Sequence, residues 1–415
     1  MSQSEAGSFN ALSIPSYRNL FVGTLASFTA FFISTVIQSV VAFELAGSNT
    51  AVGGVIFGQG VGMALSGPLG GAYADRLPKR RVIAVCQTFS AICFGTVGLL
   101  YATGRLEIAH LVLNAFLVGC AFGFIGPARQ ALVVDLVPKS LLGNAMAMTT
   151  VANTMSRVFG PLVAAVFLAV EGAGPAMAYA TMSLLYLLSA ALLLLLPRSV
   201  VRENVGETHV IEDLSAGLRY TWNHIRLRHL LLFFVSVMLI GFPHVTLIPG
   251  LLENQLGRSA NDLTKFALFS ATGALIASLT VARYADSSHA TRIYGWFAIA
   301  FGLSLIVLAS MPGFYSALAC MLLVGGTSGG FHALNGAVIA RQTDPTYMGR
   351  VMSLSMLSFA GFSLTALPLG ILADHFGEQT VLFGMGVGVF VLSIFMASVV
   401  ARDSMIRPAG GAETP

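Results

Sequence analysis

Hydrophobic residues fill long stretches of this chain, and short polar segments separate those stretches. A helix needs about 20 residues to cross the hydrocarbon core of a bilayer. Measured against that length, the pattern predicts twelve membrane-spanning helices, six on each side of a polar stretch at 197–229. They are expected near 20–45, 50–73, 82–103, 108–133, 142–169, 176–196, 230–252, 263–285, 293–311, 315–340, 351–373 and 379–400.

The polar stretch divides the chain into two halves. The predicted organisation is an N-terminal six-helix bundle at 1–196, a cytoplasmic linker at 197–229, a C-terminal six-helix bundle at 230–400 and a cytoplasmic tail at 401–415. Within the linker, apolar residues from Val210 to Trp222 recur at helical spacing. This segment is therefore expected to form an amphipathic helix on the membrane surface.

The second half repeats features of the first. Asp75 and Asp286 each end a short Gly/Ala/Tyr-rich segment, and 286 − 75 gives an offset of 211. Further pairs at an offset of 206 or 207 are Gly119 with Gly325, Gly123 with Gly329, Pro138 with Pro345, Gly143 with Gly349, and Pro161 with Pro368. Tandem six-helix repeats are typical of transporters that bind a solute near the midplane of the membrane, between the halves.

Composition and charge agree with a membrane protein. Hydrophobic residues make up 56% of the chain, charged residues 10%, and the mean hydropathy is +0.81. These values leave too little polar surface for a soluble globule of this length. The net charge of +4 does not indicate nucleic-acid binding, because the basic residues cluster at the ends of hydrophobic runs. The four cysteines lie within apolar runs without metal-type spacing, so we expect no metal and no cofactor.

The distribution of Lys and Arg predicts the orientation. One side of the predicted helices receives nearly all the basic residues, and the other receives only Arg105, Arg258 and Lys265. The positive-inside rule therefore places both the N- and the C-terminus in the cytoplasm.

The segment between the second and third predicted helices carries a specific motif. It reads Gly71-Ala-Tyr-Ala-Asp75-Arg76-Leu-Pro-Lys79-Arg80-Arg81. This segment resembles the corresponding loop of the major facilitator superfamily. The run from Pro127 to Pro138, followed by Gly160-Pro161, is similar to the branch that contains bacterial drug and siderophore exporters, such as transmembrane secretion effectors and enterobactin-exporter-like proteins.

The resemblance implies a fold and a location. It implies an all-α membrane protein of twelve transmembrane helices in two pseudo-symmetric six-helix bundles. Such a protein would work by alternating access as a multi-pass protein of the bacterial inner membrane. We expect a monomer in the lipid bilayer whose partners are a small-molecule substrate and protons.

The same resemblance implies a cytoplasmic latch that breaks when the halves move. Its expected residues are Gly71, Asp75, Arg76, Arg80, Asp286, Arg129, Gly160 and Pro161. A carboxylate at a helix end can accept hydrogen bonds from the N-terminus of a neighbouring helix, whose dipole favours an anion. The alternative is that the basic residues only anchor the topology and Asp75 is their counter-ion. The chain also departs from the family pattern, with Pro78 where Gly is usual and with Asn114 and Ala115 where proton-coupled members often carry arginine.

Polar residues within the predicted helices are candidates for a substrate or proton cavity. Arg157 lies near the middle of the fifth helix, where a charge is costly and is expected to face a cavity or a partner. The other candidates are Gln38, Gln59, Asn114, His244, His332 and Asn335. In the resembled fold, helices one, four, seven and ten line the central cavity, and all of these except Gln59 lie on those four. The alternatives are a structural contact of Arg157 with backbone carbonyls and histidines that only complete hydrogen bonds.

The leading functional hypothesis is proton-coupled efflux of small amphipathic compounds. The alternative within transport is an importer or uniporter of a polar or anionic metabolite. A membrane enzyme or a receptor is less favoured, because the sequence has no phosphate-binding Gly-x-x-x-x-Gly-Lys-Ser/Thr loop and no His-Glu-x-x-His zinc motif. We therefore expect a transporter and not an enzyme.

Overall fold

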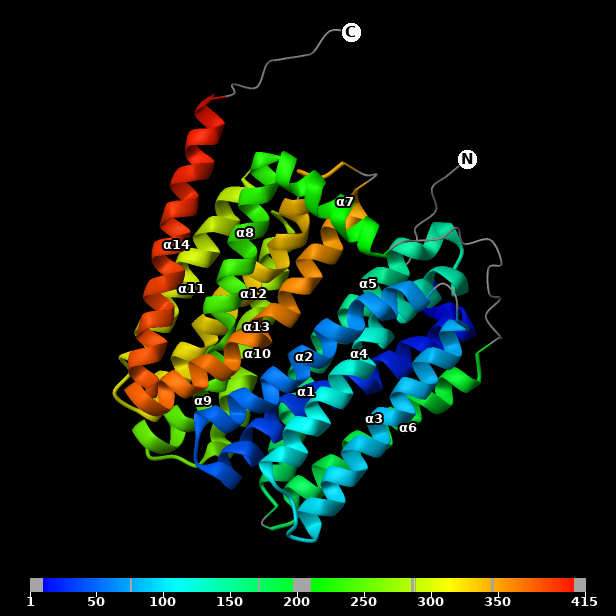
Figure 1. Ribbon diagram of the computed structural model, residues 1–415, viewed down its shortest axis with the longest axis vertical. Helices are drawn as coiled ribbons and strands as arrows, with labels where there is room; N and C mark the ends of the chain where they lie inside the picture. The colour runs from blue at the N-terminus through cyan, green and yellow to red at the C-terminus, as the bar shows by residue number, and fades with distance from the viewer. Residues whose placement is uncertain are drawn as a thin grey trace.

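The chain folds into two groups of long helices (Figure 1). The computed structural model describes residues 10–74, 77–170, 172–196, 210–284, 287, 289–344 and 347–406. The first group contains α1 (Pro15–Ala46), α2 (Asn49–Ala74), α3 (Lys79–Ala102), α4 (Ile108–Leu136), α5 (Leu142–Leu168) and α6 (Gly174–Leu194). After α7 (Val210–Asn223), the second group contains α8 (Ile225–Ile240), α9 (Ile248–Gly250), α10 (Leu263–Ala282), α11 (Ala290–Ala309), α12 (Phe314–Ala340), α13 (Met348–Phe376) and α14 (Glu378–Ile406).

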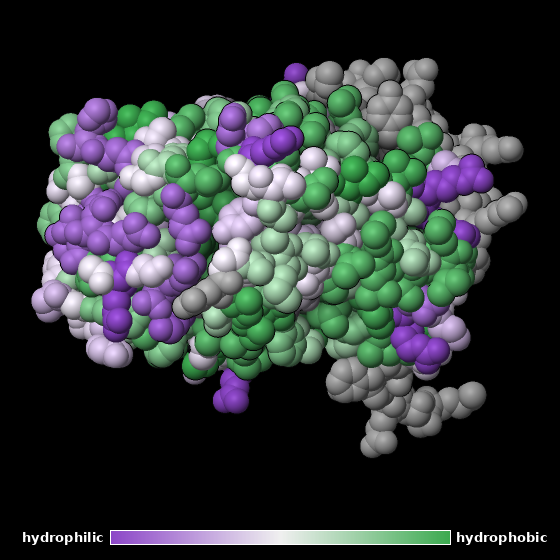
Figure 2. All heavy atoms as spheres, turned by 90° about the horizontal axis from the view of Figure 1, so that it is seen from below, coloured by the Kyte–Doolittle hydropathy of each residue, from purple (hydrophilic) through white to green (hydrophobic). Residues whose placement is uncertain are grey.

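The surface has the polarity of a membrane protein. In the described part of the chain, 11 helical spans are long and apolar enough to cross a bilayer. In Figure 2, hydrophilic residues gather at one end of the molecule and again near the opposite edge, with a broad hydrophobic surface between them. Such a surface requires a hydrocarbon solvent.

Glycines allow the central helices of each half to approach closely. A Cβ on Gly62 of α2 would lie 2.2 Å from the carbonyl oxygen of Phe116 on α4. A Cβ on Gly273 of α10 would lie 2.0 Å from the carbonyl oxygen of Leu322 on α12. The two glycines are separated by 273 − 62 = 211 positions, the same offset that separates Asp75 from Asp286. The α2/α4 and α10/α12 contacts are therefore equivalent in the two halves, and both rely on small residues as membrane helices often do.

The seventh predicted helix is not the single regular helix that its apolar run indicates. In the described segment from Ile225 to Gln255, the long α-helix α8 ends at Ile240. A 3₁₀ turn follows at Phe242–Thr246, then the short α9, then a π-helical turn at Leu251–Gln255. Pro243 and Pro249 each lack a backbone N–H, which explains why the regular ladder cannot continue. Breaks of this kind inside a membrane occur where the backbone is buried in protein or lines a cavity.

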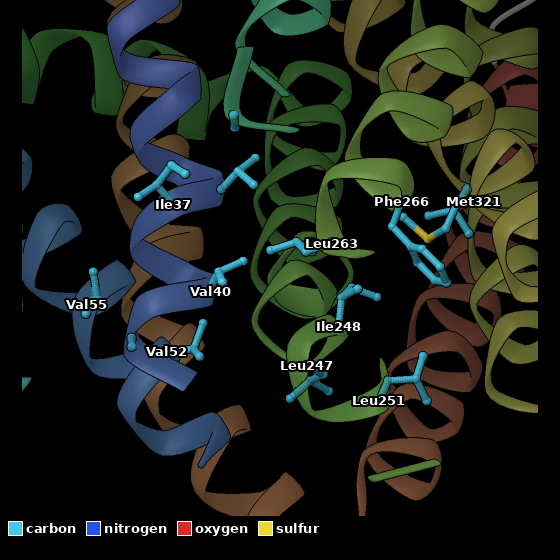
Figure 3. Close-up of a cluster of buried hydrophobic side chains, with 14 of the residues drawn as sticks. Ile37, Val40, Val52, Val55, Leu247, Ile248, Leu251, Leu263, Phe266 and Met321 are labelled. Atoms are coloured by element: carbon cyan, nitrogen blue, oxygen red, sulfur yellow. The ribbon is translucent and has the colours of Figure 1, made fainter. Parts of the chain in front are cut away.

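Apolar packing joins the two halves at one end of the molecule. Figure 3 shows Val40 of α1 pointing toward Leu263 of the second half, with Leu247 and Ile248 beyond it. These residues belong to one buried hydrophobic cluster that continues into both halves. We call this the closed end; it contains the end of α1, the start of α2 and the end of α13.

The opposite end is packed differently. One buried cluster there comes from the first half alone and includes Leu20, Leu132 and Leu193. The other comes from α8, α12 and α13, with Leu227, Leu231, Ile339 and Val351 at its centre. Each described cluster at this end therefore stabilises one half without joining it to the other.

The helix α7 lies between the halves in sequence and packs on the second. The ring of Tyr220 stacks on Tyr347 with centroids 4.2 Å apart, and the backbone N–H of Asp344 donates to the Tyr220 hydroxyl at 3.0 Å. Leu218 and Trp222 of the same helix are exposed. One face of α7 is therefore held by the protein, while its other face presents apolar side chains.

Candidate functional site

At the closed end, a carboxylate from the second half binds the start of α2. Asp374, near the end of α13, accepts hydrogen bonds from the backbone N–H groups of Asn49 and Thr50, both at 2.8 Å. Its oxygens also accept from the Asn49 side-chain amide at 2.9 Å and from the Thr50 hydroxyl at 2.5 Å. Asp374 thus satisfies N–H groups that a helix N-terminus leaves unpaired, and its charge complements the helix dipole. The interaction links the two halves.

A second carboxylate extends this network. Glu378, at the start of α14, is only 3% exposed and accepts from the side-chain amides of Asn49 at 2.9 Å and Asn254 at 2.7 Å. A Cβ on Gly250 would lie 2.4 Å from Asn49 Oδ1 and 2.5 Å from Glu378 Oε1. Glycine at 250 therefore lets the broken seventh helix approach these polar groups. We call Asn49, Thr50, Asn254, Asp374 and Glu378 the closed-end network.

Deeper in the molecule, Arg157 of α5 lies between elements of both halves. Its guanidinium is 5.9 Å from the centre of the Phe32 ring on α1, and its charge acts on His332 of α12. The residue is exposed, although its neighbours Ser156 and Gly160 are buried. Within the described residues, Arg157 makes no hydrogen bond and no ion pair. It therefore carries an accessible charge where neither half neutralises it.

Arg129 of α4 has a different environment. It is buried, it donates to the Ser27 hydroxyl on α1 at 2.9 Å, and its guanidinium lies 4.7 Å from the centre of the Phe28 ring. These contacts lie within the first half and join α1 to α4. A structural role in that half accounts for them.

The remaining cavity candidates are distributed over several environments. Asn335 accepts from the Tyr294 hydroxyl at 3.2 Å and donates to Ser355 at 2.9 Å, so it connects α11, α12 and α13. His244 is buried, with Nδ1 2.8 Å from the Gly241 carbonyl oxygen and its ring edge against Phe301. The ring of His332 stacks on Phe234 of α8 at 6.2 Å.

Three amide side chains from the first half complete the set. Gln38 is buried on α1, and Gln59 lies where the backbone of α2 approaches Gly119 of α4. Asn114 is buried as well, and neither amide atom has a hydrogen-bond partner among the described residues. A buried amide without partners is costly, so Asn114 remains a candidate for a polar ligand.

Only part of the expected latch lies within the described residues. Asp75, Arg76 and Asp286 fall outside them, and Gly71 lies in the last turns of α2. Arg80 donates to the carbonyl oxygens of Leu194 and Leu196 at the end of α6, where a cation complements the helix dipole.

An ion pair beside this segment was not predicted from the sequence. Lys79 Nζ lies 2.7 Å from Asp135 Oδ2 and joins the start of α3 to the end of α4. Both residues stand within the motifs that carry the family resemblance, but nothing in their spacing indicates that they meet.

Gly160 and Pro161 of α5 are both buried, and Gly160 lies against α1. A Cβ on Gly160 would lie 2.4 Å from Cβ of Phe32, the residue whose ring faces Arg157. The close spacing between α1 and α5 in this region therefore depends on glycine.

Replacing Gly160 with alanine should force α1 and α5 apart. We expect a loss of about 1–3 kcal/mol in the free energy of unfolding, typical of overpacking. Thermal unfolding of the purified protein in detergent measures it. Gly143→Ala on the same helix is the control, because nothing lies within 4 Å of the added Cβ. Equal melting temperatures for the two variants would contradict the tight contact.

Sequence reasoning missed the closed-end network. Asn49 looks like an ordinary residue at a helix start, and Asp374 and Glu378 look like interfacial charges. Asn49 and Asp374 are 325 positions apart, so no local pattern connects them. The available signal was a polar residue at the start of α2 and an acidic residue at the end of α13, on the same predicted side of the membrane.

The chain is similar to several transport proteins. It is 23% identical over 326 residues to a staphyloferrin A transporter of Staphylococcus aureus, covering 78% of this chain and 81% of that protein. It is 20% identical to macrolide efflux protein A of Enterococcus faecalis, covering 74% of this chain and 95% of that protein. A Na⁺, Li⁺, K⁺/H⁺ antiporter of Planococcus maritimus is 23% identical and matches 72% of this chain and 80% of its own length.

Solved structures share the fold. A D-xylose–proton symporter superimposes with a TM-score of 0.73 at 14% identity, covering 93% of this chain and 97% of that one. The nucleoside transporter NupG gives a TM-score of 0.69 at 14% identity, covering 92% of this chain and 98% of that one. The profile of the Major Facilitator Superfamily matches residues 20–360. Together with the apolar spans and the transporter relatives, this match identifies the chain as a multi-pass cell-membrane transporter that belongs to the Major Facilitator Superfamily.

Proposed function

We propose that this protein is a monomeric secondary active transporter that exports small amphipathic compounds by alternating access. In this proposal, twelve helices span the membrane, and both termini lie in the cytoplasm. The observation that carries it is the closed-end network: Asp374 and Glu378 from the second half bind the start of α2 in the first. Such a contact must break if the halves are to expose a central solute to that end.

The distribution of charge supports an orientation for this state. Lys79, Arg80 and the exposed Arg219 of α7 lie toward the end opposite the closed one, and the positive-inside rule assigns that end to the cytoplasm. The closed end then faces outward. The halves would be joined on the outside and separate on the cytoplasmic side, which is the state that receives a substrate for export.

The residues between the halves form the proposed substrate and proton cavity. Arg157 and His332 are its central members, because they belong to different halves and interact electrostatically. Gln38, Gln59, Asn114, His244 and Asn335 are the remaining candidates. A histidine suits a proton carrier because its ordinary pKa lies near neutrality.

A cytoplasmic latch is proposed for the opposite state. It would contain Gly71, Asp75, Arg76, Arg80 and Asp286, with Arg129, Gly160 and Pro161 setting the packing of the first half. Arg80 supports this assignment, since it binds the end of α6 and follows Arg76 by four positions in the sequence. The latch would then close the cytoplasmic side in one state of the transport cycle, and the closed-end network would close the outer side in the other state.

The direction of transport rests on the similarity to proteins whose names describe efflux or siderophore transport. Proton coupling rests on His332 and on the cation/proton antiporter among the relatives. Deletion of the gene should increase susceptibility to amphipathic toxic compounds, and a protonophore should remove the difference between the deletion and parent strains.

A panel of drugs and siderophores in the deletion strain, with and without the protonophore, tests this expectation. The strain complemented with the unmodified gene is the control. If susceptibility stays the same while uptake of a metabolite falls, the protein is an importer or uniporter and export is wrong.

A further inference from the structure

The helices of this protein carry an unusual balance of charge. Every Asp and Glu lies near the end of a spanning helix or in a connecting segment. The ionisable cationic or histidine side chains in the helix interiors are Arg129, Arg157, His244 and His332. A cation inside a membrane is expected to pair with an anion or to face a cavity. The sequence offers no carboxylate at that depth, so an anion would have to come from elsewhere.

Of the two interior arginines, Arg157 is the one that an incoming ligand can reach. Arg129 is buried and donates to Ser27. Arg157 is exposed and, within the described residues, forms no hydrogen bond or ion pair. An arginine has five N–H donors in a planar fork that matches a carboxylate, and stacking on a ring leaves the edge of the fork available.

Aromatic rings accompany both arginines along α1. Phe28 lies beneath Arg129 at 4.7 Å, Phe32 lies beside Arg157 at 5.9 Å, and Phe31 stacks on Phe122 of α4 at 4.8 Å. Phe31 and Phe32 follow Phe28 by three and four positions, so each lies on the same side of the helix as Phe28. An apolar or aromatic body would find its complementary surface next to the guanidinium.

We propose that Arg157 binds the anionic group of the transported compound, while Phe32 and the neighbouring rings of α1 contact its aromatic or apolar body. This inference rests on the proposed function and deepens it, because it restricts the amphipathic substrates to organic anions such as aromatic carboxylates. A cationic analogue of the same shape would meet Arg157 as a like charge. A neutral analogue would leave Arg157 unpaired.

Binding of three matched probes to the full-length protein in nanodiscs tests the proposal. The probes are 2-naphthoate, 2-naphthylmethanol and protonated 2-naphthylmethylamine, which share a ring system and differ in charge. We expect 2-naphthoate to bind most tightly, measured by equilibrium dialysis with labelled compounds. Arg157→Met should weaken its binding about 10- to 100-fold, as expected for a lost charged hydrogen bond. The same substitution should change binding of the alcohol little and should tighten binding of the amine, because it removes a like charge. Arg157→Lys should recover part of the loss, and Phe32→Ala should weaken all three.

The matched control is Arg258→Met, which removes an exposed arginine that also faces a phenylalanine, Phe314, at 4.6 Å but lies near the closed end. Its binding of 2-naphthoate should equal that of the unmodified protein. The proposal is overturned if the unmodified protein binds the amine or the alcohol more tightly than 2-naphthoate, or does not bind 2-naphthoate. It is also overturned if Arg157→Met and Arg258→Met weaken 2-naphthoate binding equally. The susceptibility panel tests the proposed export function independently of these binding measurements. If the panel shows export of cationic compounds alone, the protein is still an exporter, but the inference of an anionic substrate is wrong.

Discussion

Asp374→Ala should open the closed end of the transporter. The substitution removes an acceptor of four hydrogen bonds and leaves the N–H groups of Asn49 and Thr50 without their partner. Charge-assisted bonds of this kind suggest a loss of about 3 kcal/mol from the closed state, which is roughly a 100-fold change in its ratio to the open state. Val52, which is fully buried beside this contact, reports the opening. In a variant without the native cysteines, Val52→Cys should react faster with a polar maleimide once Asp374 is replaced.

The control for this measurement is Asp262→Ala. Asp262 is another carboxylate near the closed end, but it pairs with the exposed Lys265 at 2.6 Å, within its own half. Its removal should leave the labelling rate of residue 52 unchanged. If Asp374→Ala also leaves that rate unchanged, the interaction does not hold the halves together. Asn49→Ala is a second test, because it removes the α2 partner of Asp374 and should also accelerate maleimide labelling of residue 52.

The glycine contacts at the centre of each half predict the largest effects on folding. Gly62→Ala and Gly273→Ala each place a Cβ within 2.2 Å of a backbone carbonyl oxygen on the neighbouring helix. A backbone cannot yield as a flexible side chain does, so the helices must separate. We expect each substitution to cost about 3 kcal/mol, at the upper end of the usual range for overpacking. The measurement is the yield of monodisperse protein and its melting temperature in detergent.

Two other glycines provide matched controls for these variants. Gly67 lies on α2 like Gly62, and Gly336 lies on α12, the partner helix of Gly273; nothing lies within 4 Å of a Cβ added to either. Both alanine variants should fold as the unmodified protein does. Because Gly62 and Gly273 are equivalent in the repeat, their effects should also be similar. A large loss of stability for one variant and none for the other would contradict the equivalence of the α2/α4 and α10/α12 contacts.

The membrane architecture could be predicted from the sequence because hydrocarbon imposes a simple rule on it. A span must be long and apolar, so the boundaries of the first six helices follow from hydropathy to within a few residues. The internal repeat was visible as well, because close helix contacts demand small residues at fixed offsets, as with Gly119 and Gly325. Hydropathy could not predict the break in the seventh span, since Phe242 to Gly250 remains largely apolar while Pro243 and Pro249 interrupt its hydrogen bonds.

The candidate site was predictable only where a single residue conflicts with its surroundings. Arg157 is such a residue, because a charge in the middle of a membrane helix needs an explanation. Its neighbours could not be predicted, because Phe32 and His332 come from helices distant in sequence. Nothing in the sequence marked Asp374 as a functional residue, since carboxylates are common at helix ends. Its role depends on a partner 325 positions away, which only the folded chain brings into contact.

The side-chain amide of Asn49 donates to both Asp374 and Glu378, and Glu378 also holds Asn254. One small group on α2 therefore connects α13, α14 and the broken seventh helix. Pulling α2 away breaks the bonds of Asn49 to Asp374 and to Glu378 together, while the bond between Glu378 and Asn254 stays within the second half. We therefore expect separation on this side to be cooperative, so that a substrate encounters a barrier that is either fully shut or fully withdrawn.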